Sequence, residues 1–119
     1  EQVGQFLDKG FEQAGIDGFQ RTLHFYMPGG EIPQDDRFVK LCLEERERQF
    51  GIKSDPQPFD ASCEQCFLAR EGIQTVICGP GDIAQAHTVG EFTWEKQVRD
   101  AVSLYERIID RVLYKANYI

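Results

Sequence analysis

The sequence predicts an α/β or α+β fold in which one long C-terminal helix packs on a small sheet. Residues 73–78 form a short run rich in β-branched side chains, which is typical of a buried strand. Residues 19–27 alternate between apolar and polar side chains, as a half-buried strand does. Residues 94–113 repeat apolar side chains with a period near 3.6, which predicts a helix of about five turns.

The first quarter of the chain is expected to hold a helix, the alternating strand and a break. Apolar residues recur at helical spacing over residues 2–14, and Gly15 offers a stop for that helix. After the strand over residues 19–27, the proline- and glycine-rich stretch 28–33 is typical of a hinge or linker.

A second helix is expected to end at Phe50. Asp35 or Asp36 would be its N-cap and Gly51 would close it. Its charged run over residues 44–48 is expected to be a solvated face.

Two further capping patterns place the remaining helices. Ser62 with Gln65 three residues later resembles a capping box, which predicts a short helix over residues 63–70. Thr93 is expected to cap the long C-terminal helix.

Composition restricts the classes of partner. At 119 residues with 41% hydrophobic content, the chain suits one domain or pieces of two. A formal charge of −7 argues against nucleic acids and anionic membranes as partners, because both require clustered Lys and Arg. Four cysteines are too few for a disulfide scaffold, so a cytoplasmic location is expected. Because the chain starts at Glu1 rather than Met, we expect a processed or excised segment.

The stretch with the strongest chemical content begins where the strand over residues 73–78 ends. Gly79-Pro80-Gly81 stops the strand, and His87 follows it. Ligands of α/β proteins bind at such strand ends, and a neutral imidazole there can bind a metal or move a proton. Backbone N–H groups of the glycine loop could bind an oxyanion or carboxylate. A tight strand exit without any ligand fits the same residues.

A longer pattern across this stretch resembles a known family. Gly-Pro-Gly-x-Ile-x-Gln-Ala-His over residues 79–87, with Glu91 four residues later, is similar to the C-terminal signature of the M20 metallopeptidases. Within that family, the signature is most similar to that of the acetylornithine deacetylase branch. The family's His-x-Pro-Asp-Glu box reads His-Thr-Val-Gly-Glu here, so Val89 and Gly90 depart from it.

The resemblance implies a hydrolase that activates water between two zinc ions and removes the acyl group of an N-acyl amino acid or cleaves a small peptide. It implies that His87 is a zinc ligand. The motifs that carry the other ligands are not visible in this sequence, so we expect the chain alone to be inactive and not to retain the metal.

The resemblance assigns roles to five more positions. It implies that Gly79, Pro80 and Gly81 border the substrate. Glu64 resembles the acidic residue of the family's Thr-Glu-Ala segment and is expected to shape the pocket. Glu91 is expected to orient the histidine loop, since carboxylates often support a metal-bound imidazole.

The resemblance also divides the chain into two parts. Residues 1–29 resemble the end of the family's α+β lid domain, and residues 30–119 the C-terminal portion of its catalytic α/β domain. The leading hypothesis is therefore the C-terminal segment of a zinc-dependent amidohydrolase of amino-acid metabolism, with a homodimer as one possible assembly. A related desuccinylase or dipeptidase activity is a further option within the family.

The alternative hypothesis belongs to a different class. Cys63, Cys66, Cys78 and His87 could form a tetrahedral Cys₃His zinc site in a non-catalytic structural module. Their spacing fits no zinc module that we recognise, and Cys78 lies in a strand expected to be buried. The simpler interpretation is that the cysteines are small buried hydrophobic residues.

Overall fold

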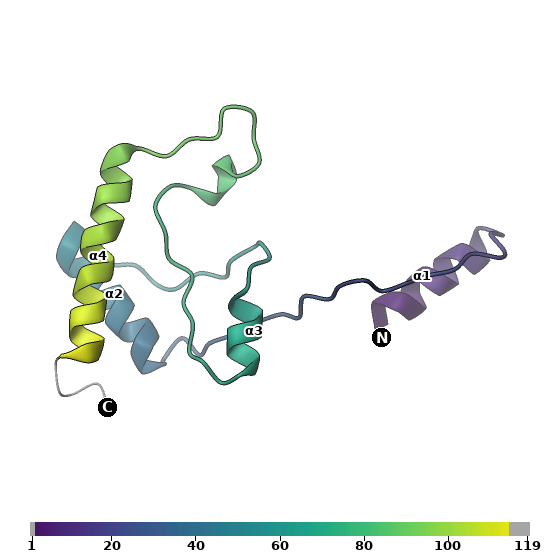
Figure 1. Ribbon diagram of the computed structural model, residues 1–119, viewed down its shortest axis with the longest axis horizontal. Coiled ribbons are helices and arrows are strands. Elements are labelled where there is room, and N and C mark those ends of the chain that lie inside the picture. The colour runs from purple at the N-terminus through teal and green to yellow at the C-terminus, as the bar shows by residue number, and fades with distance from the viewer. Residues whose placement is uncertain (1, 115–119) are drawn as a thin grey trace.

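A computed structural model describes residues 2–114, and its regular structure is helical (Figure 1). The helices are α1 (Gln2–Gln13), α2 (Arg37–Phe50), α3 (Gln65–Arg70) and α4 (Glu95–Leu113), with one turn of 3₁₀-helix, η1 (Ile83–Gln85). None of the described helices is long and apolar enough to cross a membrane.

The described residues form no β-strand, so the prediction of an α/β or α+β fold with a small sheet is wrong for this structure. Residues 19–27 and 73–78 are connecting segments without regular secondary structure (Figure 1). A strand exists only through its hydrogen-bond ladder to a neighbour, and neither segment pairs with another one within residues 2–114. Cys78, expected inside a buried strand, is exposed. The local pattern identified strand-like sequence, but a sheet also needs a second strand.

The capping patterns of α2 are confirmed. The Asp36 carboxylate accepts a hydrogen bond from the backbone N–H of Phe38 at 2.7 Å, and so satisfies one free donor of the first turn. Gly51 ends the helix in the left-handed conformation, with φ of 68°.

The expected long C-terminal helix is confirmed as α4, although its N-cap is Trp94 rather than Thr93. The side-chain oxygen of Gln97 accepts hydrogen bonds from the Trp94 backbone N–H at 3.2 Å and from the Thr93 hydroxyl at 3.1 Å.

The core lies where α2 and α4 cross and pack on each other (Figure 1). Leu41 of α2 and Ala101 and Leu104 of α4 are buried. The Gln49 amide near the end of α2 donates to the carbonyl of Asp100 near the start of α4, at 2.7 Å. Apolar burial and this polar contact together fix how far one helix is displaced along the other.

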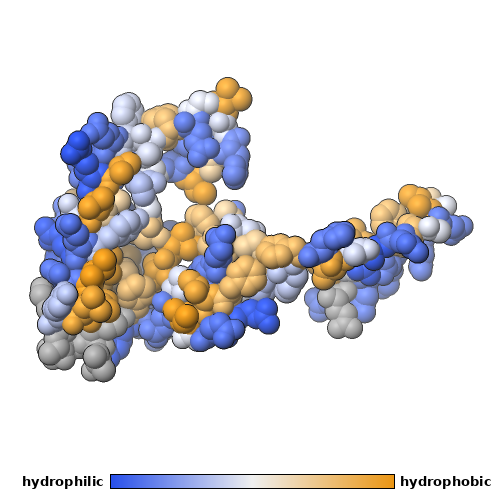
Figure 2. Space-filling view, in the orientation of Figure 1, coloured by the Kyte–Doolittle hydropathy of each residue, from blue (hydrophilic) through white to orange (hydrophobic). Residues whose placement is uncertain are grey.

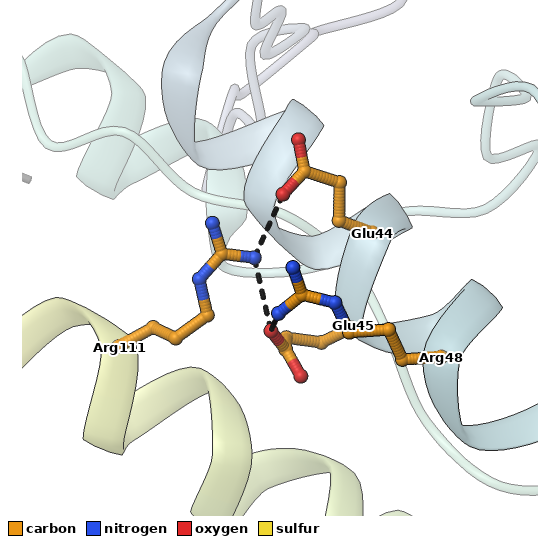
Figure 3. A network of polar contacts seen from close by, with 4 residues as sticks. All are labelled: Glu44, Glu45, Arg48 and Arg111. Carbon is orange, nitrogen blue, oxygen red and sulfur yellow. Dashed lines mark hydrogen bonds and ion pairs between the residues drawn. The ribbon is translucent and has the colours of Figure 1, made fainter. Parts of the chain in front are cut away.

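A cluster of four charged residues joins the C-terminal half of α2 to the last turn of α4 (Figure 3). Arg111 of α4 donates to Glu44 at 2.8 Å and to Glu45 at 2.9 Å, and Arg48 donates to the same Glu45 oxygen at 2.7 Å. The hydrogen bond to Glu44 raises the pKa of Arg111 above its ordinary value, so its charge is retained. Glu45 is only 3% exposed, so the expectation of a solvated face over residues 44–48 is wrong at this position. The arginine that covers it lies 66 residues away in sequence.

The N-terminal part of the chain projects away from this core (Figure 1). Arg21 forms a two-point ion pair with Asp8 of α1, at 3.0 and 3.2 Å. Phe11 packs on Phe19 with ring centroids 4.4 Å apart. Only the drawn-out segment that follows connects this unit to the rest of the molecule.

The overall dimensions are those of an open molecule. The radius of gyration is 19.9 Å, whereas a compact domain of this length has about 13–14 Å. The accessible surface is 10136 Å², against roughly 6600 Å² for a compact monomer of this mass. Much apolar surface therefore stays uncovered, including large side chains on α1 and α4 (Figure 2).

The charged cluster generates a prediction about stability. Arg111→Ala should lower the free energy of unfolding by about 1–3 kcal/mol, because it leaves the buried Glu45 carboxylate with one partner fewer. Arg48→Ala is the matched control and should cost less, because the Arg48 side chain is 57% exposed and leaves Arg111 in place. Urea denaturation of both variants measures the difference. Equal losses would show that Glu45 does not depend on the interhelical partner.

Candidate functional site

The candidate site is a loop that connects the drawn-out segment 73–78 to α4 and is held by bonds within itself. The Asp82 carboxylate accepts the Ala84 backbone N–H at 2.9 Å and thereby caps η1. The Thr88 hydroxyl donates to the carbonyl of Gln85 at 2.7 Å, and the Glu91 N–H donates to the carbonyl of Thr88 at 3.2 Å. These short-range bonds fold residues 82–91 into successive turns.

His87 lies at the turning point of this loop in an unusual conformation. Its φ of 61° is in the left-handed region, which few residues other than glycine adopt. The Glu91 carboxylate accepts a hydrogen bond from the His87 backbone N–H at 2.9 Å. This contact fixes the backbone that carries the imidazole, while the imidazole itself stays exposed and available to an external group.

The glycine loop and Glu91 line one open cleft of ≈ 860 Å³. Gly79, Pro80 and Gly81 form part of its wall, and Phe59 and Phe92 add apolar surface. The structure therefore brings together the three residues predicted to border a substrate and the carboxylate that contacts the His87 backbone. His87 itself is not part of the cleft lining.

The loop is attached to α4 by one contact that the sequence interpretation missed. The Tyr105 hydroxyl donates to the carbonyl of Cys78 at 2.7 Å, immediately before Gly79. Burial raises the pKa of Tyr105, with the Cys78 thiol adding to the effect, so the phenol stays protonated and able to donate. No local sequence pattern predicts this contact, because the two residues are 27 positions apart.

Glu64 does not join the cleft. It is the N-cap residue of the short helix α3, its side chain makes no capping bond, and it is exposed. The helix predicted over residues 63–70 is present as Gln65–Arg70, without the expected capping by Ser62.

The four cysteines border a second cavity, of ≈ 1090 Å³, between α2, α3 and the drawn-out segment. Cys66 is buried and its thiol donates to the carbonyl of Cys63 at 3.3 Å. Burial, with a smaller contribution from the neighbouring Cys78 thiol, raises the pKa of Cys42 to about 11. The pKa of Cys78 is also raised by partial burial, against the opposing effect of Arg46, although its side chain still reaches solvent.

The described residues do not assemble a metal site. No group of three or more His, Cys, Asp or Glu side chains in residues 2–114 is placed to hold an ion. The Cys₃His arrangement of Cys63, Cys66, Cys78 and His87 is therefore not formed, and its structural-module interpretation has no support in this geometry. His87 likewise has too few companions here for a zinc centre, which needs three or more protein ligands.

Comparison with known proteins assigns the chain to a family. The family model described as peptidase family M20/M25/M40 matches residues 17–111, which include the glycine loop, His87 and most of α4. No curated protein and no solved structure matches the chain significantly.

The two glycines of the loop generate a matched pair of predictions. Gly81→Ala should destabilise the chain by about 1–2 kcal/mol, because the native φ of 92° is strained for alanine. The new Cβ would also lie 3.2 Å from the Thr93 hydroxyl oxygen. Gly79→Ala is the control: its Cβ would meet only the Tyr105 hydroxyl, at 3.9 Å. Thermal denaturation compares them, and equal effects would contradict the described loop conformation.

The raised pKa of Cys42 generates a prediction about pH. The folded chain holds the neutral thiol, so this contribution to stability is complete below pH 9.0 and is lost as the pH rises through about 11. Alkylation of Cys42, followed by mass spectrometry, should reach half its maximal rate near pH 11 in the folded chain. The urea-unfolded chain is the control and should do so near pH 9.0. Coincident curves would refute the burial of this thiol.

Proposed function

The chain belongs to peptidase family M20/M25/M40, and on that premise we propose that it is the segment of a zinc-dependent amidohydrolase that supplies His87. The substrate class is an N-acyl amino acid or a small peptide, and the closest type of activity is that of acetylornithine deacetylases. The observation that carries the proposal is the match over residues 17–111.

Two features of the site support the assignment of His87 as a ligand. The imidazole is exposed, so its ring nitrogens are open to a metal ion. The loop beneath it is fixed by the Glu91 carboxylate, which binds the backbone of residue 87 rather than competing for the ring. A ligand held on a fixed backbone loses less conformational freedom when it binds.

The cleft beside the loop supports a substrate role for Gly79, Pro80 and Gly81. Glycine at position 79 leaves space in front of the backbone, since a Cβ there would meet only the Tyr105 hydroxyl at 3.9 Å, and a ligand oxygen could approach the peptide N–H groups. The apolar rings of Phe59 and Phe92 on the same cleft suit the aliphatic part of an acylated amino acid.

The proposed enzyme requires groups beyond those described. Because residues 2–114 hold no metal-ligand cluster, the remaining zinc ligands and the general base must come from outside this segment. The proposed division at residue 29 is supported by the arrangement of α1, which stands apart from the α2–α4 core (Figure 1). Location in the cytoplasm is proposed because all four cysteines are free thiols.

The two histidines of the sequence allow a controlled test of the metal role. When Zn²⁺ is added to the 119-residue chain, the NMR signals of the His87 ring should shift, and those of His24 should shift less. Dialysis against EDTA should remove the metal, because the chain offers too few ligands. The second test uses an enzyme that contains this segment together with the other zinc ligands. In it, His87→Ala should reduce both bound zinc and hydrolysis, while His24→Ala should change neither.

Three results would contradict the proposal. Hydrolysis of N-acetylated amino acids by the isolated chain would show that no further ligands are required. A larger zinc response at His24 would remove the ligand role of His87. Full activity of the His87→Ala enzyme would do the same.

A further inference from the structure

All four cysteine side chains border one cavity, the space of ≈ 1090 Å³ between α2, α3 and the segment 73–78. Cys42 comes from α2, Cys63 and Cys66 from the start of α3, and Cys78 from the end of the segment. A disulfide requires two Cβ atoms about 3.5–4.5 Å apart. The arrangement of the segment on α2 decides which two thiols are placed to react.

The segment 73–78 is held against α2 at one end and against α4 at the other. The Gln74 side-chain amide donates to the carboxylate of Asp36, the N-cap of α2, at 2.6 Å. The Tyr105 hydroxyl of α4 donates to the Cys78 carbonyl at 2.7 Å. From Gln74 to Cys78 the chain spans at most about 13 Å, the length of about nine residues of α-helix. Cys78 is therefore within reach of the middle of α2.

One face of α2 meets Cys78 there. Val39, Cys42, Leu43 and Arg46 all line the cavity, and their spacing places them on one side of the helix. Burial raises the pKa of Cys42, and the nearby Cys78 thiol adds to the rise. Burial also raises the pKa of Cys78, and the positive charge of Arg46 opposes that rise. Cys78 thus lies beside the turn of α2 that carries Cys42 and Arg46.

We propose that Cys42 and Cys78 form a reversible disulfide when the chain meets hydrogen peroxide. The bond joins α2 to the residue immediately before the glycine loop. Because Cys78 lines both the cysteine cavity and the open cleft beside that loop, the modification alters the lining of both. Disulfides of cytosolic proteins are mostly transient and redox-sensing, and this pair fits that class. The proposal does not depend on the zinc site.

The reaction takes place in two steps. Cys78 is the exposed thiol and lies near a positive charge, so it reacts first. Its thiolate attacks one peroxide oxygen, the O–O bond breaks, and a Cys78 sulfenic acid and water result. The Cys42 thiolate then attacks the Cys78 sulfur. The S–S bond forms, the S–O bond breaks, and the hydroxide that leaves takes up the proton released by Cys42. The two thiols lose two electrons in all, which reduce the peroxide to two water molecules.

The competing pair is Cys63 with Cys66. The Cys66 thiol donates to the Cys63 carbonyl at 3.3 Å, so these two residues are also adjacent. Cys66 is only 4% exposed, however, and its thiol is already engaged in that hydrogen bond. Cys42 and Cys78 are therefore the pair in which an exposed thiol can react with peroxide and a second thiol lies beside it.

Peptide mapping of the 119-residue chain distinguishes the two pairs. Trypsin places Cys42 in residues 41–46, Cys63 and Cys66 together in residues 54–70, and Cys78 in residues 71–96. After treatment with hydrogen peroxide and blocking of the remaining thiols, mass spectrometry should find peptide 41–46 joined to peptide 71–96. Dithiothreitol should separate the two peptides. The yield should not change with protein concentration, because the bond forms within one molecule.

Variants test the order of the steps. Cys42→Ser should leave Cys78 as a sulfenic acid that dimedone labels, whereas Cys78→Ser should abolish both the linkage and this label. Cys63→Ser is the matched control: it removes a thiol from the same cavity and should leave the linkage unchanged.

A glutathione redox buffer tests whether the fold holds the two thiols together. The equilibrium constant for the linkage should be about tenfold or more larger in the folded chain than in the urea-unfolded chain, because the fold raises the effective concentration of one thiol at the other. Urea unfolding of the oxidised chain should also show a higher midpoint than that of the reduced chain, since the bond closes a loop in the unfolded state.

Other outcomes overturn the proposal. A disulfide within residues 54–70 would assign the reactive pair to Cys63 and Cys66. A linkage whose yield rises with protein concentration would be a bond between molecules. Equal equilibrium constants in the folded and the unfolded chain would show that the fold does not bring the two thiols together. Peroxide treatment that leaves peptides 41–46 and 71–96 separate would exclude the disulfide.

Discussion

The position of α4 on α2 is the constraint on which the rest of the structure depends. A buried carboxylate is costly unless its partners are close, and Glu45 has two guanidinium groups on one oxygen. Because Arg111 reaches it from the other helix, a slide of α4 along α2 would leave that charge with fewer partners. The cluster therefore selects one register, and the Gln49 contact to Asp100 supports the same register near the start of α4.

The position of the candidate site depends on this register of α4 on α2. The Tyr105 hydroxyl donates to the carbonyl of Cys78, and α4 begins three residues after Phe92, so both ends of the loop are tied to the same helix. Between those ends the loop relies on its own short-range bonds. The result is a self-contained turn that presents one imidazole and one glycine-lined cleft, which is suitable as one wall of a larger active site.

The sequence predicted what depends on neighbouring residues. Asp36 and Gly51 bound α2 as expected, because capping needs only the adjacent turn of helix. The histidine loop was identified by its residues, but the left-handed φ of His87 and the contact of Glu91 to its backbone were not foreseen. The burial of Glu45 could not be predicted, since its partner lies far along the chain. The predicted sheet failed for a related reason: residues 73–78 have strand-like sequence, but no partner strand within the described chain.

The exposed segment 73–78 also affects the tendency of the chain to aggregate. Ile-Gln-Thr-Val-Ile-Cys is a six-residue window with β-branched side chains, no charge and no proline, which are the features of sequences that stack into amyloid-type sheets. Pro80 and Asp82 follow it, and Arg70 and Glu71 precede it. Proline and charged residues at such borders act as gatekeepers that interrupt stacking. The Gly79-Pro80-Gly81 loop that borders the cleft thus has a second effect, because its proline limits the stacking of residues 73–78 from different molecules.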